Sequence, residues 1–86
     1  MEVRKEIVVK NKTGLHARPA ASFVKIANKF DSEIVIEKED QKVNGKSIMG
    51  ILMLGAQQYS VVMLSAEGDD ADKLINEVEQ FLSRNE

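Results

Sequence analysis

Apolar and polar residues alternate along two stretches of the chain, residues 2–9 and 32–38, and residues 57–68 form a third stretch that has a strand-like composition. In the first stretch Val3, Ile7 and Val9 recur at even spacing, and a period of two is typical of a strand with one buried face. We therefore predict strands at all three places. Residues 41–43 follow the turn-prone sequence EKED and predict a short fourth strand, antiparallel to the second.

Two longer stretches carry apolar residues at steps of three and four, which is the pattern of a helix packed on one side. In residues 17–30 they are Ala20, Phe23, Val24, Ala27 and Phe30, and in residues 69–84 they are Ala71, Leu74, Ile75, Val78, Phe81 and Leu82. In the second stretch acidic residues crowd the first turn and Arg84 lies near the end, as the helix dipole favours. Residues 47–54 predict a helix of one or two turns N-capped by Ser47, although a short buried strand fits the same apolar run.

The predicted order of elements is β-α-β-β-α-β-α. About four strands with one-sided helices are best accommodated by an antiparallel sheet whose helices form a second layer. The expected fold is therefore an α+β open-faced sandwich, in which a four-stranded antiparallel sheet carries two long helices and one short helix on one face. We expect residues 1–86 to form a single domain, since a chain of this length can build only one core.

Composition narrows the functional classes. The chain has no cysteine, which excludes disulfides and thiolate metal sites. We find no apolar run long enough for a signal peptide or a membrane span, so we expect a cytoplasmic protein without membrane insertion. Three phenylalanines, one tyrosine and a net charge of −2 make nucleic acid a poor partner. Residues 1–30 are nevertheless basic, with seven Lys or Arg against two acids, and would attract an anion or an acidic surface.

The sequence KTGLHARPAA, residues 12–21, contains the only histidine and the only proline of the chain. Gly14 allows a tight entry into the helix, and Pro19 suits its first turn. His16 is thereby placed at or just before a helix N-terminus, where free N–H groups and the helix dipole favour an anion and a neutral, nucleophilic imidazole. Arg18 offers a guanidinium to the same anion. On the residues alone, a lone histidine near a helix start is more often a capping or surface residue than a reacting one.

Two motifs, GLHARPA at 14–20 and VNGKSIMGILMLG at 43–55, resemble the HPr family, the histidine-containing phosphocarriers of the bacterial sugar phosphotransferase system. The resemblance covers the whole chain. It implies that His16 accepts a phosphoryl group on Nδ1 from enzyme I and passes it to enzyme II A domains. It further implies that Arg18 stabilises the phosphate and that the protein is a phosphohistidine intermediate rather than an enzyme with its own turnover, with no cofactor and no metal.

The sequence GKS at residues 45–47 raises the question of a P-loop. The P-loop requires a glycine where this chain has Asp40, and it requires a parallel βαβ setting, so we exclude an ATP site. The resemblance instead implies that Ser47 is a regulatory serine, modified by an HPr kinase/phosphorylase and then read by a catabolite-control repressor. Modification would act on the surface that carries His16.

The resemblance also implies a set of partner-binding residues: Ile48, Met49, Leu52, Ala21 and Lys25. We expect Ile51 and Leu54 to be core residues instead. Alternative functions are a nitrogen-branch phosphocarrier, a mainly regulatory signalling partner, or a small ligand-sensing domain without phosphotransfer. The presence of His16 argues against the catabolite-repression paralogue, which the resemblance implies lacks that histidine. No coiled-coil pattern or strong dimer seam is present, so we expect a monomer.

Overall fold

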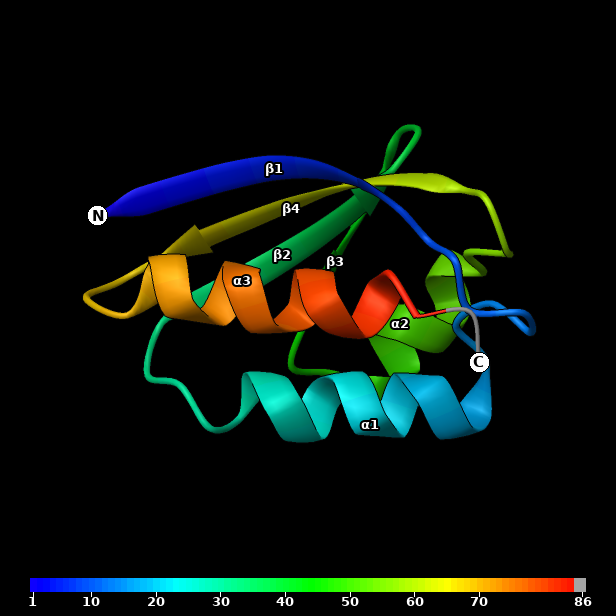
Figure 1. Cartoon of the computed structure of the whole chain (residues 1–86), viewed down its shortest axis with the longest axis horizontal. Coiled ribbons are helices and arrows are strands. Elements are labelled where there is room, and N and C mark those ends of the chain that lie inside the picture. Colours follow the sequence, from blue (N-terminus) through cyan, green and yellow to red (C-terminus); the bar gives the residue numbers. More distant parts are fainter. Residues whose placement is uncertain (85–86) are drawn as a thin grey trace.

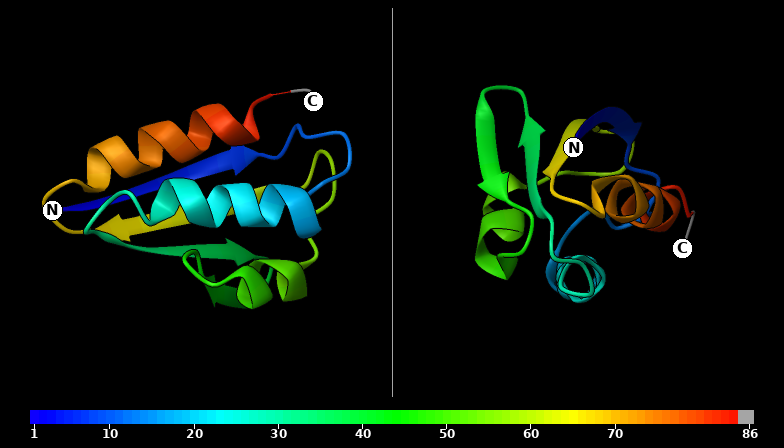
Figure 2. Two further views of the ribbon diagram at one scale, coloured as in Figure 1. Left: turned by 90° about the horizontal axis from the view of Figure 1, so that it is seen from below. Right: turned by 90° about the vertical axis from the view of Figure 1, so that its left-hand side faces the viewer.

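The computed structural model describes residues 1–84 and shows one layer of strands covered by helices. Its elements are β1 (Glu2–Val8), α1 (Ala17–Ala27), β2 (Glu33–Lys38), β3 (Gln41–Asn44), α2 (Ile48–Leu54), β4 (Val61–Glu67) and α3 (Ala71–Leu82). The strands form an antiparallel sheet in the spatial order β1-β4-β2-β3. All the helices lie on the same face of this sheet (Figures 1 and 2). The predicted α+β sandwich and its order of elements are confirmed.

The alternating residues of the strands determine which face of the sheet meets the helices. The strand residues buried against the helices are Ile7, Ile34, Ile36, Val62, Leu64 and Ala66. Neighbouring positions such as Val35 and Val61 point to the uncovered face and are 37% and 50% exposed. A period of two therefore holds on both central strands, β4 and β2, and it aligns their apolar residues across the sheet.

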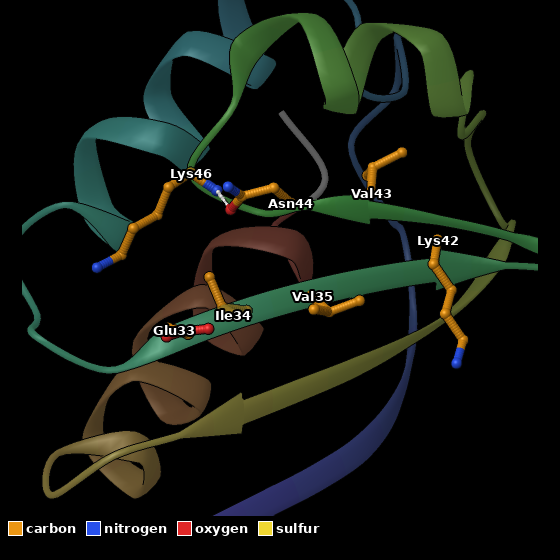
Figure 3. Close-up of a pocket in the computed structure, with 7 residues that line it drawn as sticks. All are labelled: Glu33, Ile34, Val35, Lys42, Val43, Asn44 and Lys46. Carbon is orange, nitrogen blue, oxygen red and sulfur yellow. Dashed lines mark hydrogen bonds between the residues drawn. The ribbon is translucent and has the colours of Figure 1, made fainter.

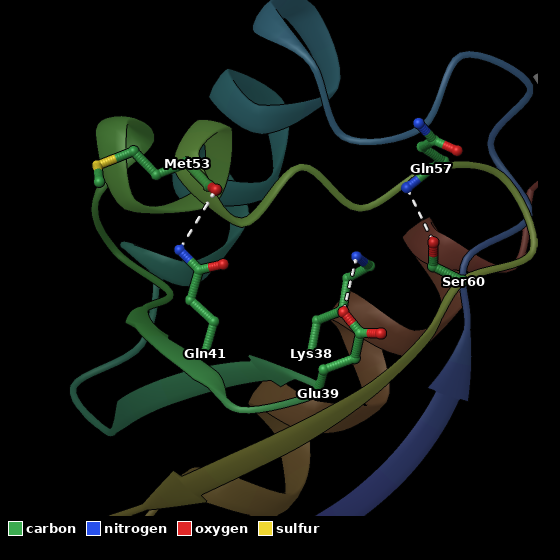
Figure 4. A network of polar contacts seen from close by, with 6 residues as sticks. All are labelled: Lys38, Glu39, Gln41, Met53, Gln57 and Ser60. Atoms are coloured by element: carbon green, nitrogen blue, oxygen red, sulfur yellow. Dashed lines mark hydrogen bonds and ion pairs between the residues drawn. The ribbon is translucent and has the colours of Figure 1, made fainter.

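The last strand begins four residues later than the sequence predicts. Residues 57–60 form a turn instead, in which Ser60 N–H donates to the carbonyl of Gln57 at 3.0 Å and Gln57 N–H donates to Ser60 Oγ at 2.9 Å (Figure 4). Tyr59 in this turn has φ +72°, a left-handed conformation that cannot continue a strand. Its N–H is held by the carbonyl of Val9 at 2.6 Å, so a tertiary contact selects the turn.

Both long helices pack their predicted apolar faces, but they end earlier than expected. α1 stops at Ala27 because the N–H groups of Lys29 and Phe30 bond three residues back, to Ile26 and Ala27, and tighten the chain into a turn. Phe30 still packs against the core from outside the helix. α3 covers residues 71–82 of the predicted 69–84.

Residues 47–54 form a helix rather than a strand. Ser47 is its N-cap, because Ser47 Oγ accepts a hydrogen bond from Gly50 N–H at 3.0 Å. Gly55, with φ +64°, ends the helix in the left-handed conformation common at helix C-termini. Gln41 at the start of β3 donates to the carbonyl of Met53 at 3.4 Å and holds the end of α2 to the sheet (Figure 4). Within residues 1–84 no helix is long and apolar enough to cross a membrane.

Candidate functional site

The loop between β1 and α1 is shaped around Gly14. This residue has φ +70°, and its N–H donates to the carbonyl of Asn11 at 3.0 Å. A Cβ at position 14 would lie 2.5 Å from the carbonyl oxygen of Ala56, so only glycine fits. The next residue, Leu15, is buried and donates its N–H to the same carbonyl at 2.8 Å. Because the two loops are held this close together, the position of the next residue, His16, relative to the core is fixed.

His16 is the N-cap residue of α1 and is exposed. Its backbone is extended, with φ −96° and ψ −159°, and its carbonyl accepts the first helical hydrogen bond from Ala20 N–H at 2.8 Å. The imidazole makes no capping hydrogen bond. Because a helix leaves its first N–H groups without intrahelical acceptors, those of Ala17 and Arg18, which directly follow His16, have no acceptor among residues 1–84. An imidazole beside open N–H donors suits a group that carries an anion.

The histidine and the predicted arginine line one hollow of about 640 Å³. Its lining residues are Asn11, Thr13, His16, Ala17, Arg18, Pro19, Ser22 and Phe81. Phe81 comes from the last turn of α3, far from the others in sequence, and closes one side. Within residues 1–84 no hydrogen bond or ion pair holds the exposed guanidinium of Arg18, so it is available to an oxyanion in the hollow. The structure thus brings His16 and Arg18 together.

Ser47 does not belong to this hollow. α1 and α2 run antiparallel, since Leu15 before α1 bonds Ala56 after α2, while Lys46 before α2 donates its ammonium to the carbonyl of Phe30 after α1 at 2.7 Å. Ser47 and His16 therefore lie at opposite ends of the helix pair, and α2 itself is about 10 Å long. The structure therefore does not bring the Ser47 hydroxyl and the His16 imidazole into one site.

The proposed contact residues differ in exposure. Ile48 and Met49 are 43% and 66% exposed, whereas Leu52 is half-buried. Ala21 and Lys25 are exposed on α1. The sequence analysis did not include Met53, whose side chain is 67% exposed. Met53 follows Met49 by four residues, and this spacing could have indicated that both side chains lie on the same face of the helix. Ile51 and Leu54 are core residues, as predicted.

A second hollow, of about 450 Å³, lies between β2 and β3 (Figure 3). It includes Asn44 and Lys46 from the GKS region, and Asn44 Oδ1 accepts the N–H of Lys46 at 2.9 Å. The Lys46 ammonium already donates a hydrogen bond to the carbonyl of Phe30. The preceding strand, β3, is an edge strand that pairs antiparallel to β2. These features agree with the exclusion of a P-loop. Among residues 1–84 no group of three or more His, Cys, Asp or Glu side chains is placed to hold a metal ion.

Comparison with known proteins gives closely similar relatives. The chain is 48% identical over 82 residues to the HPr-like protein Crh of Halalkalibacterium halodurans, a match that covers 95% of this chain and 98% of that protein. HPr-C-His from Thermoanaerobacter tengcongensis is 55% identical with a TM-score of 0.90, over 93% of this chain and 90% of that one. Crh from Bacillus subtilis, a dimer with a swapped domain, is 40% identical with a TM-score of 0.79, over 96% and 95%. The monomeric state expected here stays a prediction.

The family match extends over nearly all the described residues. The family model described as the PTS HPr component phosphorylation site matches residues 3–84. The matched region contains both sequence motifs, GLHARPA and VNGKSIMGILMLG. The chain therefore belongs to the HPr family.

Proposed function

We propose that this protein is a phosphocarrier that receives a phosphoryl group on His16 from enzyme I and donates it to enzyme II A domains. The observation that carries the proposal is the exposed imidazole at the open N-terminus of α1, in the same hollow as Arg18. Within the family, the presence of His16 favours this role, because the resemblance implies that the catabolite-repression paralogue lacks a histidine there.

The transfer needs only one nucleophile. The lone pair of Nδ1 attacks phosphorus while the proton of the neutral ring stays on Nε2; the new N–P bond forms as the bond from phosphorus to the donor breaks, and that electron pair stays with the donor. The onward step reverses these changes towards the acceptor. Arg18 and the N–H groups of the first turn of α1 stabilise the charge on the equatorial oxygens, which is the main task of a phosphoryl-transfer site.

Partners would dock on the surface formed by Ala21, Lys25, Ile48, Met49 and Leu52, which we name the α1–α2 surface. Its exposed apolar residues, Ile48 and Met49, lie on α2, and Lys25 on α1 adds a positive charge to the same surface. A phosphate added to Ser47 by an HPr kinase/phosphorylase brings about −1.5 to −2 charge to the edge of this surface. We expect that charge to weaken docking of enzyme I and to create a site for a catabolite-control repressor.

A second candidate function is that of a mainly regulatory partner, which responds through Ser47 and transfers no phosphate in a transport pathway. The similarity to the HPr-like proteins Crh favours it. A nitrogen-branch phosphocarrier would retain the chemistry at His16 but serve other partners. The two candidate functions differ in one measurable respect, namely which side chain is phosphorylated and by which donor.

Purified protein should be incubated with phosphoenolpyruvate and enzyme I, and separately with ATP and an HPr kinase. The carrier role requires a phosphate that is labile in acid and stable in base, formed only in the first reaction and absent from His16→Ala. Acid-stable phosphate formed only in the second reaction, with none in the first, would establish the regulatory role and refute the carrier role. Ser47→Ala is the matched control, since it removes acid-stable phosphate and leaves acid-labile phosphate unchanged.

A further inference from the structure

Among the described residues, 1–84, two polar side chains are fully buried, Asn11 at 5% and Ser32 at 2% exposure. Ser32 has its partner, because Asp70 accepts its hydroxyl and its N–H. Asn11 does not. Its Oδ1 is buried without any hydrogen-bond partner, and leaving a buried amide oxygen unpaired destabilises the fold, whereas an aliphatic side chain of similar size would carry no such penalty.

Asn11 lies at the wall of the His16 hollow, and its orientation is constrained. Its Nδ2 donates to the carbonyl of Phe81 at 3.5 Å, and the adjacent N–H of Lys10 donates to the carbonyl of Leu82 at 2.8 Å. These contacts attach the loop to the last turn of α3, whose final carbonyls have no acceptor role within the helix. With the amide nitrogen directed at α3, the oxygen is the end left for another donor.

We propose that Asn11 is a positioning residue of the phosphoryl-transfer site, which accepts a hydrogen bond on Oδ1 from the Arg18 guanidinium when the hollow holds the phosphoryl group. This inference rests on the proposed carrier function. Asn11 and Arg18 line the same hollow from the loop and from α1. The guanidinium has five N–H donors in a rigid plane, so one edge grips the oxyanion while the other edge keeps donors for a second acceptor.

The chemistry of the second acceptor matters. A carboxylate would form an ion pair with Arg18 and compete with the phosphoryl group, whereas a neutral amide oxygen orients the guanidinium and leaves its charge for the phosphate. Thr13 and Ser22 also line the hollow, but these residues are less buried than Asn11. Water can therefore form hydrogen bonds with their hydroxyls. Asn11 is the buried acceptor in the described wall that lacks a partner.

The test compares Asn11→Leu, which keeps the branched four-atom side chain and removes both the Oδ1 acceptor and the Nδ2 donor to Phe81, with the wild type and with Arg18→Ala and the double variant. We expect Asn11→Leu to slow phosphoryl transfer from enzyme I about tenfold, the effect of losing one hydrogen bond to a charged group, with an unchanged or higher Tm. In the Arg18→Ala background the same change should have no further effect. Asn76→Leu, a matched change on the exposed side of α3, should leave transfer unchanged.

A spectroscopic measurement complements the rates. In the phosphorylated protein we expect the Arg18 side-chain N–H signals to be sharp and protected, and Asn11→Leu should abolish that protection. An equal slowing in the wild-type and Arg18→Ala backgrounds, or full-speed transfer in Asn11→Leu, would overturn the inference while leaving the carrier role intact. If the wild-type protein acquires no acid-labile phosphate at all, it is the proposed function that fails, so the two failures are distinguishable.

Discussion

The carboxylate of Asp70 accepts the backbone N–H and the hydroxyl of Ser32, and thereby joins the start of α3 to the loop between α1 and β2. A third hydrogen bond comes from the N–H of Asp31 at 3.0 Å. These donors, with the Ser32 hydroxyl first, lower the pKa of Asp70 from its ordinary value of 3.8. Gly68 is part of the same junction, because a Cβ there would lie 2.3 Å from Ser32 Oγ.

The first prediction concerns acid stability. Because folding lowers the pKa of Asp70, the stability it contributes is complete above pH 3.8 and is lost as the pH falls below that value towards the folded pKa. Asp70→Ala should therefore have a lower Tm than the wild type at pH 7. Because the wild type loses the contribution of Asp70 in acid, the difference in Tm between the two proteins should shrink at pH 3 or below. Asp69→Ala, an exposed neighbour outside the junction, is the control. Parallel Tm curves for the wild type and Asp70→Ala across this range would contradict the assignment.

The second prediction separates backbone strain from steric clash. Gly14 and Gly55 both have positive φ, but a Cβ at Gly14 would meet the Ala56 carbonyl at 2.5 Å while nothing lies within 4 Å of one at Gly55. Gly55→Ala should cost about 1 kcal/mol of unfolding free energy. Gly14→Ala should cost clearly more, of order 2–4 kcal/mol, because the loop must also shift. Urea unfolding measures the loss of unfolding free energy in each variant. Equal losses would show that the Ala56 carbonyl does not obstruct a Cβ at position 14.

The third prediction tests the cap of α2. Ser47→Ala removes the acceptor of the Gly50 N–H and should reduce the unfolding free energy by about 1 kcal/mol. Faster hydrogen exchange at the Gly50 amide should accompany the loss. Ser65→Ala on the uncovered face of the sheet serves as the matched control and should change stability by less than about 0.5 kcal/mol. An unchanged Gly50 exchange rate would show that the hydroxyl does not cap the helix.

The fourth prediction distinguishes docking residues from core residues on α2. Met49 is 66% exposed, so Met49→Ala should change stability by less than about 0.5 kcal/mol but weaken binding to enzyme I. Ile51 is fully buried, and Ile51→Ala should cost about 2–5 kcal/mol. Thermal unfolding and titration calorimetry give the two quantities. Undiminished binding by Met49→Ala would remove Met49 from the proposed α1–α2 surface.

The fifth prediction concerns the turn before β4. Tyr59 has φ +72° and its side chain is 67% exposed, so Tyr59→Gly relieves the backbone and gives up little packing. We expect a gain of about 1 kcal/mol in unfolding free energy. The same change at the preceding residue, Gln58→Gly, should destabilise the protein, since φ there is not positive. A loss of stability in Tyr59→Gly would mean that the aromatic ring makes a stabilising contact.

The apolar faces of the helices were predictable because a period of 3.6 residues is a local property: Ala20, Phe23 and Val24 are buried as expected. Helix and strand ends were not, because distant groups decide them. The turn at Tyr59 depends on the carbonyl of Val9, fifty residues earlier in the chain. The His16 site divides in the same way. Its histidine, arginine and glycine lie within five residues, whereas Asn11 meets Phe81 seventy residues away.

By itself, the sequence determined the type of the strands and of the two long helices, the apolar faces of those helices and the place of His16 at or just before the start of α1, since periodicity, capping and turn chemistry act over a few neighbouring residues. It left residues 47–54 open between a helix and a strand, and the structure shows a helix there. The strand order β1-β4-β2-β3, the separation of Ser47 from His16 along α2 and the burial of the Asn11 amide beside α3 were decided by the tertiary structure. These depend on which distant surfaces pack together, and the free energy of such packing belongs to pairs of segments that no local pattern relates.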